Sequence, residues 1–142
     1  MTQTTNYPNV KQSATLIEKV IANRGGDNPL KGECYIASMV LYELYDGKNM
    51  NLVKKMDVNG QYHWWLEYWS GNKIEIIDIT REQYVNENKP CPSDNPEGRV
   101  IGKPMRYQSY KKRIRRLKDG LTHQYPEYYG DLLNDRQLAS LT

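Results

Sequence analysis

The sequence predicts a single α+β domain in which helices pack on a small antiparallel sheet. Before residue 46, apolar residues recur at helical spacing on either side of a glycine- and proline-containing break at residues 23–29. After residue 52 the period changes to the two-residue alternation of strands, interrupted by glycine-containing turns. The 142 residues are the length of one ordinary domain. We expect residues 13–142 to form it, behind a polar arm of residues 1–12.

Two helices are expected first. Residues 13–22 have Ser13 as a capping residue and an apolar face, which is typical of an amphipathic helix. The next helix begins near residues 32–33, runs to Tyr45 and ends at residues 46–47. Its apolar residues surround the helix axis, which predicts a helix that is buried on most sides.

The remaining elements follow from changes of pattern. Three strands rich in aromatic and β-branched residues are expected at residues 52–58, 62–69 and 73–79. They are followed by a helical turn at 80–84 capped by Thr80, a proline-rich surface loop at 86–104, a basic helix at 109–118 and a loosely docked last helix at 126–141.

The aromatic content is unusual, because the chain has twelve tyrosines and three tryptophans but no phenylalanine. Buried tyrosine hydroxyls need partners, so the core is hydrogen-bonded, or part of the aromatic surface contacts another molecule. The longest nearly unbroken apolar run, residues 35–44, is far shorter than the roughly 20 residues that cross a bilayer. We therefore expect no membrane contact. Because the first nine residues have no signal-peptide pattern, we also expect a cytoplasmic location.

The sequence contains no phosphate-binding loop, no dinucleotide fingerprint and no Gly-x-Ser-x-Gly elbow, so we expect no cofactor. Instead, Cys34 stands in the first turn of the expected buried helix. Backbone N–H groups and the helix dipole at that position favour the thiolate, which is the nucleophilic form of cysteine. The alternative interpretation is that Cys34 is simply a small buried apolar residue.

A nucleophilic thiol needs a base, and His63 is placed to supply one on the aromatic strand. A two-residue turn at residues 70–71 would put Asp78 of the next strand directly opposite His63. A turn at residues 71–72 would make Asp78 the diagonal neighbour of His63 on the same face. A three-residue turn would place the two side chains on opposite faces.

Cys34, His63 and Asp78 are the groups that a thiol acyl-transfer site requires, in a suitable chain order. The carboxylate would orient the imidazole, which accepts the thiol proton and returns it to the leaving group. They predict a thiol-dependent hydrolase or acyltransferase that acts on an amide, thioester or ester. Trp65 shares the strand face of His63 and is a candidate substrate-binding residue. Alternatively, His63 is an ordinary core histidine and Asp78 caps the following turn.

Three motifs carry a family resemblance: Gly32-x-Cys34-Tyr35-Ile36-Ala37-Ser38, His63-Trp64-x-Leu66 and Ile77-Asp78-Ile79-Thr80. Over about residues 30–118 the chain resembles the YunG-like family of small bacterial and phage-encoded proteins. The resemblance implies a minimal papain-like or transglutaminase-like cysteine fold, with Cys34, His63 and Asp78 as its catalytic triad. The resemblance implies no particular substrate, so the substrate can be an acyl compound or a protein.

The same resemblance adds two candidate substrate-binding residues. Asn28 stands upstream of the cysteine, where papain-like enzymes have a glutamine that donates to the oxyanion. Glu33 is a departure from the family, since relatives have a neutral or basic residue there, and a carboxylate beside the thiol opposes thiolate formation.

Two further interpretations concern metal and nucleic acid. The two cysteines and two histidines (Cys34, His63, Cys91 and His123) contain no closely spaced ligand pair, so we expect no metal site. Residues 103–118 contain eight basic and no acidic residues, although the whole chain carries only +3. The alternative function is thus a non-catalytic, phage-encoded binding protein that engages a host factor or nucleic acid. Any nucleic-acid binding is expected to be weak and non-specific, through Lys103, Lys111, Lys112, Arg113, Arg115 and Arg116. The simpler interpretation of these residues is a solvated face.

Overall fold

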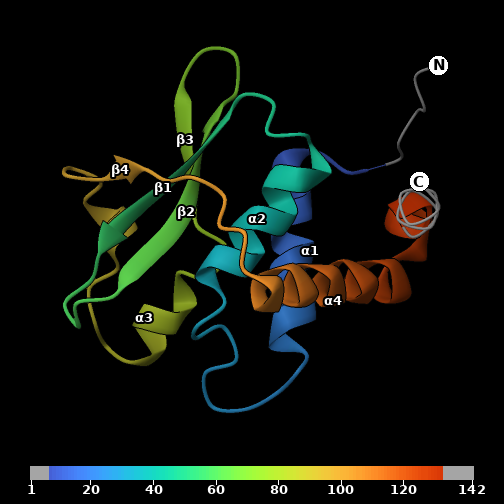
Figure 1. Cartoon of the computed structure of the whole chain (residues 1–142), viewed down its shortest axis with the longest axis horizontal. Helices are drawn as coiled ribbons and strands as arrows, with labels where there is room; N and C mark the ends of the chain where they lie inside the picture. Colours follow the sequence, from blue (N-terminus) through green and yellow to red (C-terminus); the bar gives the residue numbers. More distant parts are fainter. Residues whose placement is uncertain (1–6, 133–142) are drawn as a thin grey trace.

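The computed structural model describes residues 7–132 and confirms the α+β class (Figure 1). Its elements, in chain order, are α1 (Val10–Ala22), α2 (Cys34–Leu44), β1 (Met50–Met56), β2 (Tyr62–Trp69), β3 (Ile74–Ile77), α3 (Glu82–Asn86), the 3-10 turn η1 (Pro92–Asp94), β4 (Val100–Ile101) and α4 (Gln108–Gln124). Residues 126–132 form a further helical segment. No helix within residues 7–132 is both long and apolar enough to span a bilayer.

Helix α1 begins at Val10, earlier than predicted, because Asn9 rather than Ser13 caps it. The Asn9 side chain accepts a hydrogen bond from the backbone N–H of Gln12, whose own side chain bonds back to the Asn9 backbone. This reciprocal capping box satisfies two otherwise unpaired donors of the first turn. The prediction that Ser13 caps this helix is therefore wrong. The helix also includes residues 10–12, which were predicted to belong to a polar arm.

Tyrosine hydroxyls in the core are hydrogen-bonded, which confirms one of the two alternatives that composition left open. Buried Ser13 contacts the hydroxyls of Tyr45 at 2.8 Å and of Tyr129 at 2.7 Å. The backbone N–H of Met105 donates to the Tyr35 hydroxyl at 2.6 Å. Tyr129 is fully buried and anchors the segment 126–132, so loose docking is wrong for this part of the expected last helix. The rest of that helix lies outside the described residues.

The sheet is antiparallel throughout, with strand order β3-β2-β1-β4. Leu66 of β2 pairs with Ile77 of β3, a register that corresponds to a two-residue turn at 71–72. This is the second of the three registers considered from the sequence. Because side chains alternate along a strand, the register places His63 and Asp78 on the same face of the sheet.

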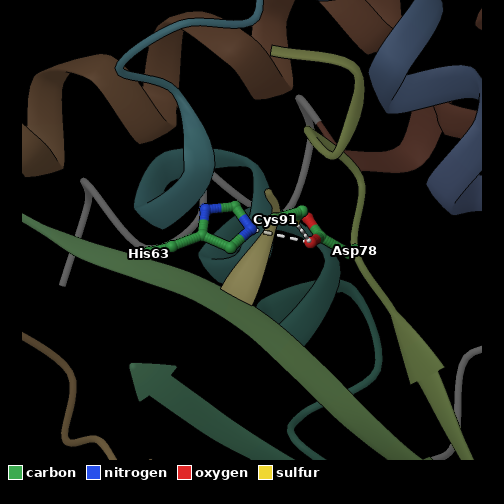
Figure 2. A group of neighbouring side chains, drawn as sticks. All are labelled: His63, Asp78 and Cys91. Carbon is green, nitrogen blue, oxygen red and sulfur yellow. Dashed lines mark hydrogen bonds and ion pairs between the residues drawn. The ribbon is translucent and has the colours of Figure 1, made fainter. Parts of the chain in front are cut away.

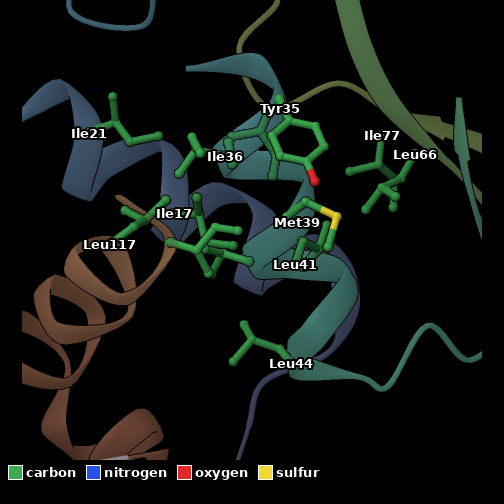
Figure 3. Packing of buried hydrophobic residues seen from close by; sticks show 14 of the residues in the cluster. Ile17, Ile21, Tyr35, Ile36, Met39, Leu41, Leu44, Leu66, Ile77 and Leu117 are labelled. Atoms are coloured by element: carbon green, nitrogen blue, oxygen red, sulfur yellow. The ribbon is translucent and has the colours of Figure 1, made fainter. Parts of the chain in front are cut away.

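One face of the sheet packs against α2 and holds the main core (Figure 3). The helices α1 and α4 pack against α2, which is consequently buried on nearly all sides, as predicted. Trp64 of β2 lies in this core, with its ring in edge contact with Tyr35 of α2 at 4.9 Å between centroids. Gly102 follows β4 beside the same indole, and a Cβ at that position would lie 2.2 Å from the Trp64 ring.

The opposite face of the sheet carries His63 and Trp65 and has its own smaller cluster of buried residues. The segment after α3 packs on this face through η1, which contacts β1, and buries Cys91. The prediction of a plain surface loop over residues 86–104 is wrong, because the segment also supplies β4 as the fourth strand. The many prolines of this segment favour a loop prediction, whereas η1 and β4 form through contacts with residues that are distant in the sequence.

Candidate functional site

Cys34 is the first residue of α2, and Gly32 turns the chain into it with a positive φ of 79°. Glu33, the residue before the helix, makes no side-chain capping bond. Its carboxylate instead pairs with Arg24 at 3.1 Å and with Arg113 of α4 at 2.9 Å. Two guanidinium groups thus compensate the negative charge that Glu33 places beside the thiol of Cys34.

His63 and Asp78 form a buried pair, in which Nε2 of the imidazole lies 2.7 Å from Oδ2 of the carboxylate (Figure 2). His63 belongs to β2, and Asp78 directly follows β3. Both side chains are almost completely removed from solvent. Among the described residues, the other two polar atoms of the pair, Nδ1 of His63 and Oδ1 of Asp78, have no hydrogen-bond partner.

The Asp78 carboxylate is held by three donors on one oxygen. Besides His63, the Ser93 hydroxyl donates to Oδ2 at 2.6 Å and the Cys91 thiol at 3.2 Å. Cys91 and Ser93 also contact each other at 3.2 Å. Neither residue is predicted from the sequence to lie at the site, because both belong to the proline-rich segment that is expected to be a surface loop. No local spacing indicates that this segment crosses the sheet face beside Asp78.

The charge state of His63 follows from opposing effects. Burial disfavours the charged imidazolium, but the hydrogen bond with Asp78, and then the thiols of Cys34 and Cys91, outweigh it. The pKa of His63 therefore lies above its ordinary value of 6.5. Both cysteines thus lie close enough to His63 to influence it, one at the start of α2 and one in the segment before η1.

Tyr84 of α3 packs directly against His63. Its ring meets the imidazole edge-on at 4.9 Å between centroids, and its hydroxyl donates to Asp57 in the β1–β2 hairpin at 2.8 Å. Burial alone would raise the pKa of Asp57, but hydrogen bonds from Gln61, Tyr84 and Asn59 hold it below its usual range. The hydroxyl bond therefore ties α3 to the hairpin, and the ring contact holds α3 against the imidazole.

A pocket of about 350 Å³ opens at the start of α2. Its lining includes the thiol-bearing Cys34 together with Tyr35, Trp64, Tyr84, Met105 and Tyr110. Among the described residues, His63 and Asp78 do not line it. Of the three predicted catalytic residues, Cys34 is therefore the one that lines the pocket.

The structure does not bring the three predicted substrate-binding residues to this pocket. Asn28 donates from its side-chain amide to the carbonyl of Gln83 at 3.0 Å and ties the preceding loop to α3. Glu33 is engaged in its ion pairs with Arg24 and Arg113. Trp65 lies beside His63, with 5.8 Å between ring centroids, but it is fully buried.

The donor atoms of His63, Asp78 and Cys91 lie within 4.8 Å of one another, close enough to share a metal ion. The spacing of the cysteines and histidines predicted no metal site, and that prediction did not include Asp78 among the ligands. Antiparallel strand pairing and the return of the segment before η1 bring His63, Asp78 and Cys91 together.

The basic segment divides into paired and unpaired charges. Arg113 bonds to Glu33 and to the Gly32 carbonyl, and Lys118 bonds to Glu43. The other five predicted nucleic-acid contacts are exposed and form no ion pair with any described residue: Lys103, Lys111, Lys112, Arg115 and Arg116. Arg113 therefore stabilises the contact between α4 and α2 rather than standing free.

Fold and site together define a small α+β protein with a cysteine at a helix start and a buried histidine–aspartate pair next to it. A family model described as YunG protein matches residues 12–119. The chain belongs to this family, which confirms the YunG-like part of the resemblance found in the sequence motifs. No curated protein and no solved structure matches the chain significantly.

Proposed function

We propose that the protein is a thiol-dependent hydrolase or acyltransferase with a papain-like arrangement of Cys34, His63 and Asp78. One observation carries this proposal: His63 is held by Asp78 at Nε2 and is influenced by the thiol of Cys34, which itself lines a pocket. Substrates of this chemistry are amides, thioesters or esters. The raised pKa of His63 supports the proposal, because an imidazolium next to a sulfur favours the nucleophilic thiolate.

The reaction needs only the groups present. The sulfur of Cys34 attacks the acyl carbon, so a C–S bond forms as the bond to the leaving group breaks. His63 gives its proton to the departing amine, alcohol or thiol. Water, deprotonated by His63, then attacks the thioester and releases the acid together with the free thiol. In a transferase, an acceptor nucleophile replaces the water.

Two features support the assignment of roles. Asp78 is buried and bonded to the imidazole, so it orients His63 and stabilises its positive charge without contacting the substrate. The backbone N–H groups at the start of α2 lie next to Cys34, and no side chain caps this helix. N–H groups at such a position can stabilise the negative oxygen that develops on the attacked carbonyl.

The test is alkylation by iodoacetamide at pH 7, followed by intact mass and peptide mapping. We expect Cys34 to react faster than Cys91, and His63→Gln to slow Cys34 by at least about tenfold. The comparison with His63→Gln is the decisive one, because Cys91 is buried and should react slowly for steric reasons alone. Rates for Cys34 that are equal in the two proteins, with folding verified by circular dichroism, would refute the proposal.

A second measurement separates reactivity from catalysis. Incubation with a panel of thioester and ester acyl donors should give a covalent acyl-protein, detected by intact mass. The acyl group should be attached to Cys34 as a thioester, so Cys34→Ser should not form this adduct. Cys91→Ser is the matched control, since it changes the same atom in the other cysteine. An adduct that persists in Cys34→Ser but disappears in Cys91→Ser would show that Cys91 is the nucleophile and would refute the proposed role of Cys34.

A further inference from the structure

We propose that His63, Asp78 and Cys91 form a zinc-binding site, and that a bound zinc ion blocks the acyl-transfer chemistry of Cys34. The binding itself follows from the cluster alone. The blocking effect rests on the proposed function. The three side chains come from β2, from the residue after β3 and from the segment before η1, so three separate parts of the fold converge on one point (Figure 2).

The donor set suits zinc. An imidazole nitrogen, a carboxylate oxygen and a cysteine sulfur are the three ligand types that Zn²⁺ takes in proteins. A thiolate and an imidazole select against Mg²⁺ and Ca²⁺, which prefer oxygen ligands. Three protein ligands leave a fourth tetrahedral position for a water molecule.

An unpaired polar atom points to a missing partner. Oδ2 of Asp78 receives three donors, whereas Oδ1 of the same buried carboxylate has none among the described residues. A buried carboxylate oxygen without a partner is costly, and a cation that the carboxylate binds through both oxygens would give Oδ1 that partner. The Ser93 hydroxyl, 2.6 Å from Oδ2, would remain as the hydrogen bond that orients the ligating carboxylate.

The site needs little rearrangement to accept the ion. Tetrahedral ligands at zinc bond lengths of about 2.0–2.3 Å stand roughly 3.3–3.6 Å apart. The nitrogen of His63 and the sulfur of Cys91 now lie 2.7 Å and 3.2 Å from Oδ2 of Asp78. The donors must therefore separate by about half an ångström as the ion replaces the protons between them.

Zinc would stop the acid–base role of His63. A ring nitrogen that ligates zinc cannot carry a proton, so the imidazole could no longer become an imidazolium. It would then be unable to take up the Cys34 proton and pass it to a leaving group. Cys91 separates metal binding from catalysis, because it supplies a thiolate ligand to the metal but takes no step in the proposed acyl transfer.

The experiment measures binding of zinc and cobalt to EDTA-stripped protein. We expect one equivalent of Zn²⁺ in competition with a chromogenic chelator, and a sulfur-to-metal charge-transfer band with Co²⁺. Cys91→Ser should weaken binding by at least about tenfold and remove the band, whereas Cys34→Ser, the matched control, should keep both. Absence of stoichiometric binding at micromolar zinc, or loss of the band in Cys34→Ser but not in Cys91→Ser, would overturn the site.

The blocking effect has its own readout. Zinc should slow alkylation of Cys34 in the unsubstituted protein, EDTA should restore it, and Cys91→Ser should be insensitive to zinc. If zinc binds but Cys34 reacts at an unchanged rate, the blocking role is overturned. If Cys34 is unreactive even in the stripped protein while zinc still binds through Cys91, the proposed function fails and the metal site stands.

Discussion

The hydroxyl of Ser93 donates to the same carboxylate oxygen of Asp78 that contacts His63, at a distance of 2.6 Å. Ser93 and Asp78 are fifteen residues apart, and the chain between them passes through α3 before it returns across the sheet. The segment before β4 is therefore part of the site, since it supplies two of the three donors that hold Asp78. Its conformation should affect both folding and the reactivity of Cys34.

Replacing Ser93 by alanine should destabilise the protein by about 1–3 kcal/mol, because a buried carboxylate loses a hydrogen bond. The same change should slow alkylation of Cys34 by loosening the Asp78–His63 pair. Urea denaturation and alkylation rates measure the two effects. Ser109→Ala, at an exposed position in α4, is the matched control and should be neutral. A neutral Ser93→Ala would show that Cys91 and His63 suffice to hold the carboxylate.

Trp64 and Trp69 of β2 should differ sharply in their contribution to stability. Trp64 is buried in the main core against Tyr35, so Trp64→Ala should cost about 3–5 kcal/mol of unfolding free energy. Trp69 is 46% exposed, and Trp69→Ala should cost much less. Chemical denaturation measures both. Equal losses would mean that Trp64 is not packed as the structure shows.

Gly102→Ala should be destabilising for a purely steric reason. Its Cβ would lie 2.2 Å from the Trp64 ring, so overpacking should cost about 1–3 kcal/mol. The control is Gly130→Ala, since no heavy atom lies within 4 Å of a Cβ built there. Thermal unfolding of the two variants separates crowding at Trp64 from a general effect of removing a glycine. Relief of the cost in the double variant with Trp64→Leu would confirm that the indole is the cause.

Tyr129 should make the protein sensitive to alkaline pH. Burial raises the pKa of Tyr129 to about 12, although its hydrogen bond with Ser13 acts in the opposite direction. Because the folded-state pKa exceeds the ordinary value of 10, the stabilising effect of the neutral form is complete below pH 10. It is lost as the pH rises from 10 towards 12. Denaturation midpoints should therefore fall in this window, and less steeply in Tyr129→Phe.

Local signals in the sequence sufficed for some elements and failed for others. The bounds of β2 were predicted residue for residue, because its aromatic alternation lies between two clear turns. The register of β2 on β3 was one of three alternatives left open by the sequence, two of which put His63 and Asp78 on one face. Ser93 and Cys91 could not be placed beside Asp78, because only the tertiary return of a proline-rich segment brings them there. The early start of α1 follows from a local signal, the capping box of Asn9 and Gln12, which competes with Ser13 as the helix cap.

The exposed face of α4 should bind polyanions weakly and without sequence preference. Arg113 and Lys118 are engaged in ion pairs, which leaves mainly Lys111, Lys112, Arg115 and Arg116 to neutralise phosphates. These four side chains are hydrogen-bond donors without an acceptor, so they can neutralise phosphates but cannot by themselves distinguish all the bases of a mixed sequence. Raising salt from about 50 to 200 mM should therefore release the protein from a heparin or DNA column, because binding depends on counterion release.

Charge reversal on that face tests whether α4 itself is the contact. The triple variant Lys112→Glu, Arg115→Glu and Arg116→Glu should abolish retention even at low salt. The control reverses three exposed lysines elsewhere, Lys19, Lys48 and Lys73, and changes the net charge by the same amount. Retention that survives in the control but not in the α4 variant locates the surface, whereas equal losses would show that only net charge matters. Sub-micromolar, sequence-selective binding at 200 mM salt would contradict the electrostatic interpretation and make nucleic-acid recognition the principal function.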